Sequence, residues 1–179
     1  MEYEDPVTPP DLCVDVSSGR TEQLTFSNPP ALAANALVTP EVVSYRAQDG
    51  LEIPAFLYRP AQPSGAAVMY PTAVPRLSMS SSGTFGQYLV AKGTLSAPNY
   101  RGSTGYGRAF AEANHFAWGK GDLQDCLVRR AFSTPWTGST RRLASAGSSY
   151  GGCCLTAGVL SRDPDYLCAC GVASTATWS

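Results

Sequence analysis

The stretch RLASAGSSYGGCCLTAGVL at residues 142–160 carries the clearest structural signal in the sequence. Residues 142–146 predict a short buried strand, and residues 149–160 predict a helix of small residues. Between them, Gly147-Ser148-Ser149-Tyr150-Gly151 matches the G-x-S-x-G pattern of a sharp strand-to-helix turn. Glycines are needed on both sides of the serine because neighbouring backbone comes too close for side chains. We therefore expect Ser149 to occupy a strained position at the N-terminus of a helix.

A serine on such a turn is placed for nucleophilic chemistry. The turn exposes the hydroxyl oxygen and directs the first backbone N–H groups of the helix toward the same point. The motif therefore predicts that Ser149 is the nucleophile and that the backbone N–H of Tyr150 stabilises an oxyanion. A glycine-rich turn without chemistry is the alternative that the motif alone leaves open.

Short apolar strands alternate with helical segments around this turn, which predicts βαβ units and a mostly parallel sheet. The expected strands are residues 42–46, 53–58, 66–70, 94–97, 142–146 and 167–173, and the other expected helices are 85–92 and 122–132. The region before residue 40 differs, because residues 12–16 and 21–26 alternate apolar and polar side chains around a turn, as in a β-hairpin. We expect residues 1–11 to be unpaired and residues 27–40 to be a connector.

Composition excludes several classes of protein. Of the 179 residues, 44% are hydrophobic and 15% are charged, a balance typical of folded chains. The net charge of −1 argues against a nucleic-acid binder that works through a basic field. No apolar run approaches the roughly 20 residues that span a bilayer, and the acidic N-terminus does not match a secretory signal, so we expect a cytoplasmic protein. The cysteines form no C-x-x-C pair and His115 is the single histidine, so we expect buried thiols, no metal site and no cofactor.

Three motifs together resemble one family of enzymes. NYRGSTGYG (residues 99–107), WGKGDLQDC (118–126) and GSSYGG (147–152) occur in the order and approximate spacing of the prolyl oligopeptidase family of serine peptidases. The resemblance is strongest to its acylaminoacyl-peptidase and dipeptidyl-peptidase-like branch, and it extends over roughly residues 11–173. Residues 40–60 resemble that family's entry into its α/β-hydrolase domain, and residues 12–26 resemble the last hairpin of the β-propeller that precedes this domain.

The resemblance implies an α/β-hydrolase-type, mainly parallel sheet with flanking helices, C-terminally incomplete and preceded by a β-hairpin remnant of a propeller. It implies two parts, an N-terminal segment with the hairpin and linker (residues 1–39) and a partial peptidase domain (residues 40–179). The implied function is hydrolysis of peptide or acyl-peptide bonds through an acyl-enzyme on Ser149, with Tyr150 as a backbone oxyanion donor. The implied partner is a peptide or acyl-peptide substrate, with no nucleic acid and no membrane.

The sequence departs from the family pattern in three places. Thr72, Ala73 and Val74 stand where the family has His-Gly-Gly, which puts its second oxyanion element in doubt. After Ser149 the sequence has no histidine, and its acids are Asp163 and Asp165, which we expect in an exposed turn. His115 precedes Ser149, the wrong chain order for the general base of an α/β-hydrolase.

These departures keep two other functions open. One is a catalytically silent fragment or binding subunit that lacks the triad acid and histidine, and the other is a carboxylesterase-like hydrolase. The acids Asp122 and Asp125 are expected to do no more than favour the dipole of the helix they begin. Residues 167–173 contain no charge and no proline, so we expect an open sheet edge there and self-association through it.

Overall fold

The computed structural model describes residues 1–16, 19–29, 37–62, 65–71, 81–128, 143–164 and 166–172. Its strands are β1 (Glu2–Tyr3), β2 (Asp11–Val16), β3 (Arg20–Gln23), β4 (Glu41–Arg46), β5 (Glu52–Tyr58), β6 (Ala67–Met69), β7 (Thr94–Pro98), β8 (Leu143–Ser148) and β9 (Tyr166–Val172). Its helices are α1 (Ser81–Val90), α2 (Arg108–Glu112), α3 (Gly121–Leu127), the π-helix η2 (Gly151–Thr156) and α5 (Ala157–Arg162).

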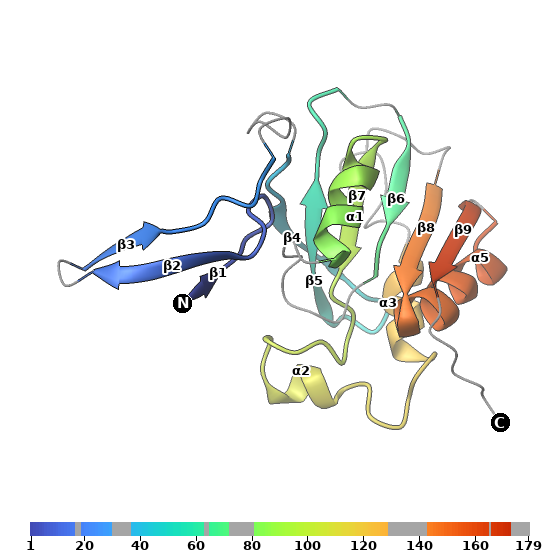
Figure 1. The fold of residues 1–179 in the computed structure, drawn as a ribbon. Helices are drawn as coiled ribbons and strands as arrows, with labels where there is room; N and C mark the ends of the chain where they lie inside the picture. Colours follow the sequence, from blue (N-terminus) through green and yellow to red (C-terminus); the bar gives the residue numbers. More distant parts are fainter. Residues whose placement is uncertain are drawn as a thin grey trace.

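A six-stranded sheet in the order β4-β5-β7-β6-β8-β9 forms the centre of the molecule (Figure 1). The pairs β7–β6, β6–β8 and β8–β9 are parallel, whereas β4–β5 and β5–β7 are antiparallel. The prediction that the strands on both sides of the glycine–serine turn form one mainly parallel sheet is therefore confirmed. All five residues of β7 are buried, as expected for a central strand covered on both faces.

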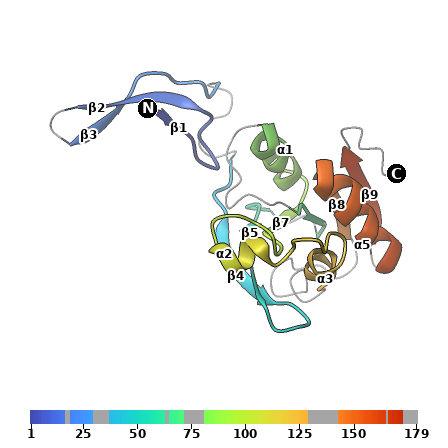
Figure 2. The same cartoon turned by 90° about the horizontal axis from the view of Figure 1, so that it is seen from below.

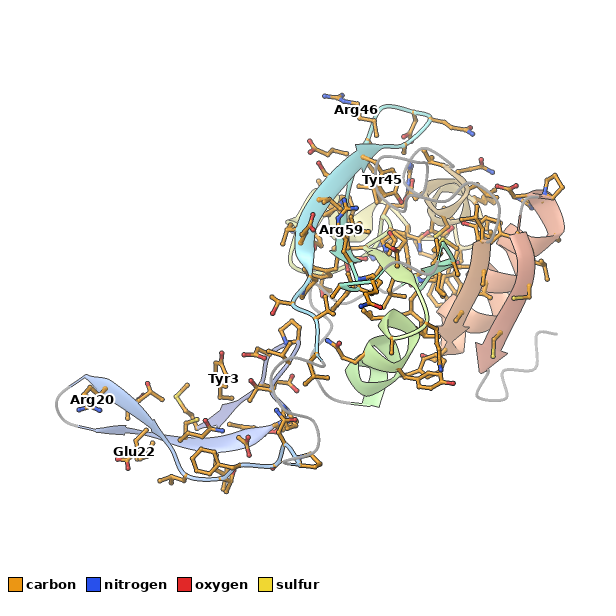
Figure 3. All side chains as sticks on the ribbon, turned by 90° about the horizontal axis from the view of Figure 1, so that it is seen from above. Tyr3, Arg20, Glu22, Tyr45, Arg46 and Arg59 are labelled. Carbon is orange, nitrogen blue, oxygen red and sulfur yellow. The ribbon has the colours of Figure 1, made fainter. Side chains whose placement is uncertain are left out.

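Helices cover the two faces of this sheet (Figure 2). On one face Leu123 and Cys126 of α3 and Leu155 and Val159 of the η2–α5 helix pack in a common apolar cluster. On the other face Val90 of α1 packs in a second cluster with residues of β5, β7 and β8. Neighbouring side chains of β4 point to opposite sides of the strand, as Figure 3 shows for two of them. Tyr45 points into the body of the molecule and joins the apolar cluster with α3, whereas Arg46 points away from it.

Some expected bounds of these elements are wrong. Helix α1 begins at Ser81 rather than residue 85, because a first helical turn tolerates the small polar residues that obscure its periodicity. Helix α3 ends at Leu127, because Val128 is extended at φ −70° and ψ 94°; residues 129–132 of the helix expected there lie outside the described part. Helix α2 was not predicted, since five residues are too few to show a helical period.

The N-terminal strands form a separate antiparallel sheet in the order β1-β2-β3, which stands to one side of the central sheet (Figures 1 and 2). The expectation that residues 1–11 are unpaired is wrong. Glu2 and Tyr3 pair with β2, and the terminal ammonium of Met1 donates to the carbonyl oxygen of Cys13 at 2.6 Å. The prolines of this region lie in the β1–β2 connection, so they remove no donor from the ladder.

One glutamine side chain joins helix α1 to the N-terminal segment and to the connector before β4. The amide nitrogen of Gln87 in α1 donates to the carbonyl oxygens of Pro6 at 2.8 Å and Val38 at 2.9 Å. Its amide oxygen accepts from the backbone N–H of Val38 at 3.0 Å. Gln87 is 8% exposed, so these bonds fix the connector and the N-terminal segment against α1.

Among the described helices, none has the length and apolarity that would let it cross a membrane.

Candidate active site

Ser149 lies at the junction between β8 and the helix that follows. Strand β8 ends at Ser148, Ser149 has a φ of 51°, and helical backbone begins there and continues into η2. A positive φ is rare for a serine because its Cβ approaches the neighbouring carbonyl oxygen. The expected strained strand-to-helix turn is therefore present, and its serine side chain is exposed.

Close backbone contacts explain the glycines of the motif. A Cβ atom on Gly147 would lie 2.6 Å from the carbonyl oxygen of Gly151. A Cβ atom on Gly151 would lie 2.9 Å from the carbonyl oxygen of Pro71, the second residue after the end of β6. Distances this short do not occur between real Cβ and oxygen atoms, so the turn requires glycine at both positions. The same contacts place the beginning of residues 71–75 beside the turn, but Thr72, Ala73 and Val74 lie outside the described residues.

The side chain of Tyr150 is held by a buried polar network. Its hydroxyl donates to Oδ2 of Asp122 and accepts from the backbone N–H of Gly119 at 2.7 Å. Its ring lies 5.1 Å from that of Trp118 and 6.3 Å from that of Tyr100, measured between centroids. Tyr150 therefore ties the helix after Ser149 to the WGKG segment and to the loop after β7.

Asp122 is the acceptor at the centre of this network. It is fully buried and also accepts from Nδ2 of Asn114 at 3.1 Å and from the backbone N–H of Leu123 at 2.8 Å. The expectation that Asp122 does no more than favour its helix dipole is wrong, because its donors come from several segments of the chain. Local sequence patterns did not predict this network, because Asn114 and Tyr150 lie outside the WGKGDLQDC motif that contains Asp122.

Asp125 is likewise more than a helix-dipole residue. Its carboxylate accepts from Nε of Arg101 at 2.9 Å, from Nη2 at 2.7 Å and from the Arg101 backbone N–H at 3.0 Å. Nη1 of Arg101 also donates to Asp49, in the turn between β4 and β5, at 2.7 Å. A Cβ on Gly121 would lie 2.8 Å from Cδ of Arg101, so the second glycine of WGKG makes room for the guanidinium.

Charge and burial shift the carboxyl pKa values around Arg101 in opposite directions. The hydrogen bond from Arg101 lowers the pKa of Asp49 below its usual value. Burial raises the pKa of Asp125, and the bonds from Arg101 offset part of that rise. The two carboxylates raise the pKa of Arg101, which stays charged. Arg101 thus anchors the NYRGSTGYG loop to the β4–β5 turn and to helix α3.

A cavity of about 610 Å³ is lined, among the described residues, by His115, Phe116 and Trp118. Phe116 is fully exposed and has a φ of 55°. The His115 side chain is exposed and, in the part of the chain that the structure describes, forms no hydrogen bond with Ser149. Figure 1 shows α2 and α3, which bracket this segment, at the end of the sheet where β8 terminates.

Asp163, the first acid after Ser149, does not lie in an exposed turn. Asp163 follows α5, is 7% exposed, and its backbone N–H donates to the carbonyl oxygen of Val159 at 2.9 Å. The expectation that it is solvated is therefore wrong, because the end of the helix packs down onto β9. Asp165 lies outside the described residues. Within the described ranges no cluster of His, Cys, Asp and Glu could hold a metal ion.

Comparisons with known proteins point to one family. The family model described as the prolyl oligopeptidase family matches residues 82–179. The uncharacterized peptidase YuxL of Bacillus subtilis (strain 168) is 32% identical over 160 residues, which is 82% of this chain and 24% of that protein.

Solved structures agree on the fold. A puromycin-hydrolyzing peptidase of Mycobacterium tuberculosis superposes with a TM-score of 0.79 at 24% identity, over 95% of this chain and 28% of that one. A puromycin hydrolase gives 0.76 at 27% identity, over 94% of this chain and 27% of that one. The Pyrococcus horikoshii acylaminoacyl peptidase gives 0.76 at 22% identity, over 94% of this chain and 28% of that one. The chain thus spans about a quarter of the length of these relatives. Since the family match covers more than half of the sequence and contains the Ser149 turn, the chain belongs to the prolyl oligopeptidase family of peptidases.

Proposed function

We propose that this chain carries the nucleophile of a serine peptidase that hydrolyses peptide or acyl-peptide bonds through an acyl-enzyme on Ser149. The observation that carries the proposal is the φ of 51° at Ser149, on a turn between β8 and a helix. Backbone strain of this kind persists where the surrounding structure imposes it, and it is concentrated at functional sites. The matched family and the peptidase relatives support the same chemistry.

The proposed reaction has two steps. The Oγ of Ser149 attacks the scissile carbonyl carbon, its proton passes to a general base, and the backbone N–H of Tyr150 donates to the resulting oxyanion. The C–N bond then breaks and the amine leaves with a proton, which produces a serine ester. Water hydrolyses that ester, restores the Ser149 hydroxyl and releases the acid product. The hydrogen bonds from the Tyr150 hydroxyl to Asp122 and from Gly119 to that hydroxyl support this role of Tyr150. They limit movement of the residue whose backbone N–H is proposed to donate to the oxyanion.

Relatives that are named as peptidases support a peptide substrate over the ester of a carboxylesterase-like hydrolase. Two solved structures 27% identical to this chain are named puromycin hydrolase, one of them a mutant complexed with PGG. We propose a peptide or acyl-peptide as the substrate class here, with residues 40–179 as part of the peptidase domain. Residues 1–39 are proposed to be part of a preceding β-propeller. Apolar side chains exposed on strand β2 of their sheet, Leu12 at 55% and Val14 at 39%, support a further layer against it.

A fluorophosphonate probe tests the nucleophile. We expect the purified chain to be labelled on Ser149, as located by peptide mass spectrometry, and we expect Ser149→Ala to abolish labelling. The neighbouring Ser148→Ala is the control and retains it. Labelling that survives in Ser149→Ala would refute the assignment.

A hydrolysis assay distinguishes the proposed peptidase from a catalytically silent binding subunit. We expect the chain alone to cleave an acyl-peptide anilide slowly, because loss of one triad member costs several powers of ten in rate. If cleavage is fast and His115→Ala removes it, His115 is the general base despite its place before Ser149. If the probe does not label Ser149 at all, the silent alternative replaces the peptidase.

A further inference from the structure

We propose that Asp122 is a positioning residue for the Ser149 turn. It acts through the side chain of Tyr150, whose backbone N–H is the proposed oxyanion donor, and it takes no part in the chemical steps. This inference rests on the proposed peptidase function and names a further residue on which that function depends. Three features support it, namely the donors around Asp122, the two points at which Tyr150 is held, and the irregular helix after Ser149.

The first feature is that Asp122 is a buried carboxylate bonded to neutral donors. It is 0% exposed, and it forms no ion pair with any residue that the structure describes. Its oxygens accept from the Tyr150 hydroxyl, from Nδ2 of Asn114 at 3.1 Å, and from the backbone N–H groups of Gly119 at 3.3 Å and Leu123 at 2.8 Å. Because a buried carboxylate is unfavourable unless hydrogen bonds replace its water, Asp122 holds the Tyr150 hydroxyl firmly in place.

The second feature is that Tyr150 is held at both ends. Its backbone directly follows Ser149, and its hydroxyl bonds to a residue 28 positions earlier in the chain. Its ring also packs near Trp118, at 5.1 Å between centroids. A tyrosine side chain has only two flexible χ angles, so a bonded hydroxyl and a packed ring restrict the position of its backbone. Asp122 thereby limits where the Tyr150 N–H points.

The third feature is the irregular backbone around the turn. The π-helix η2 (Gly151–Thr156) begins directly after Tyr150. Such turns are rare and occur frequently at functional sites. The φ of 51° at Ser149 is likewise a conformation that surrounding contacts must impose. Since no regular α-helical ladder runs through this segment, a side-chain bond from outside it bears directly on how the backbone is placed.

The alternative is that Asp122 has a structural role alone. Replacement of a merely structural residue lowers the stability of the protein but leaves the reactivity of Ser149 unchanged in the molecules that remain folded. The rate of the chemical step per folded molecule therefore distinguishes the two roles.

Fluorophosphonate labelling at a series of probe concentrations measures this rate. It gives the affinity of the probe (KI) and the rate constant of phosphonylation (kinact), for protein shown by circular dichroism to be folded. Asp122→Asn keeps the size of the side chain and replaces its carboxylate by an amide. We expect kinact to fall about tenfold or more with KI unchanged, because loss of an oxyanion donor costs roughly 100- to 1,000-fold and displacement of the donor costs part of that.

Tyr150→Phe removes the same hydrogen bond and leaves the carboxylate in place. We expect it to lower kinact to a similar degree. The double variant should react no more slowly than the slower single variant, since both changes act through one contact. If Asp122→Asn does not fold, Tyr150→Phe decides the question, because an unchanged kinact in that variant overturns the positioning role.

Tyr45→Phe is the matched control. The Tyr45 hydroxyl donates to the backbone carbonyl oxygen of Asp125 at 2.8 Å in a buried site, so this change also removes a buried hydrogen bond of a tyrosine. It should lower the midpoint of urea unfolding and leave kinact unchanged. A fall in kinact as large as that in Asp122→Asn would show that the rate follows stability, and it would overturn the inference.

A second measurement separates this inference from the proposed function. In protein labelled with ¹⁵N-tyrosine, the backbone amide signal of Tyr150 is identified by its loss in Tyr150→Phe. We expect Asp122→Asn to shift this signal and Tyr45→Phe to leave it in place. A shift without labelling of Ser149 in the unmodified protein would refute the nucleophile and retain Asp122 as the residue that places Tyr150. Labelling of Ser149 at an unchanged kinact in Asp122→Asn would refute the positioning role alone.

Discussion

At the scale of single residues, close approach between backbone segments decides which side chains the Ser149 turn accepts. Gly147 is packed against the peptide between Gly151 and Gly152, and no side-chain rotation can relieve a contact between two backbones. Tyr150 is constrained differently, since its hydroxyl both donates and accepts in a buried site. These two residues determine how rigidly Ser149 is presented.

Gly147→Ala is expected to destabilise the protein by about 3 kcal/mol or more, because the new methyl group meets a carbonyl oxygen that cannot move away. Urea unfolding monitored by circular dichroism measures the change. The control is Gly86→Ala in α1, where the added Cβ lies 3.5 Å from Leu95, an ordinary contact. That variant should gain about 0.5–1 kcal/mol from helix propensity. A Gly147→Ala protein as stable as the parent would show that the turn is looser than described.

Tyr150→Phe is expected to lower the free energy of unfolding by about 1.5–3 kcal/mol, the usual effect of losing a hydrogen bond to a buried charged group. It should also slow labelling of Ser149 by the fluorophosphonate probe, because the residue proposed to supply the oxyanion N–H is then no longer held by Asp122 and Gly119. Tyr88→Phe, on an exposed tyrosine of α1, is the matched control and should change stability by less than about 0.5 kcal/mol. Unchanged stability of Tyr150→Phe would contradict the network around Asp122.

At the scale of elements, Arg101 connects three parts of the chain through ion pairs. Its side chain is 14% exposed, and it joins the β4–β5 turn at Asp49 to helix α3 at Asp125, whose side chain is fully buried. Because ionised Asp49 is stabilised by Arg101, its pKa is lowered, and the stability it adds is complete at neutral pH. That contribution is lost as the pH falls below about 3.8, the usual pKa of the group.

Arg101→Met is expected to destabilise the protein by about 3–5 kcal/mol at about pH 7, since it leaves the buried Asp125 carboxylate without its cation. Burial already raises the pKa of Asp125, and removal of Arg101 raises it further. A carboxyl group with a raised pKa in the folded state costs stability when it is ionised, so the loss should shrink as the pH falls toward about 4.5.

Urea unfolding of the unmodified protein and of Arg101→Met, each at about pH 7 and about pH 4.5, measures this effect. The surface pair of Arg59 and Glu41, whose side chains are 40% and 55% exposed, provides the control. Arg59→Met should cost no more than about 1 kcal/mol at neutral pH. A loss in Arg101→Met that grows on acidification would refute the burial of an ionised Asp125.

At the scale of the whole molecule, β9 is the last strand of the six-stranded sheet in the described part of the chain. It pairs with β8 along Leu143–Ser148, and its outer edge offers backbone donors and acceptors. Cys168 and Cys170 on this strand are exposed, contrary to the expectation that the thiols are buried, because alternate residues of an edge strand face solvent. The strand carries no charge that would oppose pairing with a second strand.

We expect the isolated chain to self-associate at micromolar concentration through this edge. Size-exclusion chromatography with light scattering, under reducing conditions to exclude disulfides through Cys168 and Cys170, measures the mass. Cys168→Lys places a charge on the strand and should shift the protein toward monomer, whereas Lys92→Met, far along the chain in the α1–β7 turn, should not. A monodisperse species of 18.9 kDa for the unmodified chain would contradict self-association.

Local sequence patterns predicted the glycine–serine turn, the mainly parallel sheet and the N-terminal hairpin. They did so because strand alternation, glycine spacing and short apolar runs are properties of neighbouring residues. The same patterns failed for β1, because a strand of two residues is too short to show alternation. They also failed for the end of α3, where the apolar period continues past the residue at which the backbone becomes extended.

Only the tertiary structure decided the strand order and the surroundings of Ser149. Arg101 and Asp125 are 24 positions apart, Tyr150 and Asp122 are 28 apart, and Tyr150 and Gly119 are 31 apart. Contacts across such separations depend on how β7, β8 and α3 pack, which no local period encodes. The sequence thus determined by itself where the Ser149 turn stands and why glycines flank it. The packing of distant segments determined what holds Tyr150 and what pairs with Arg101.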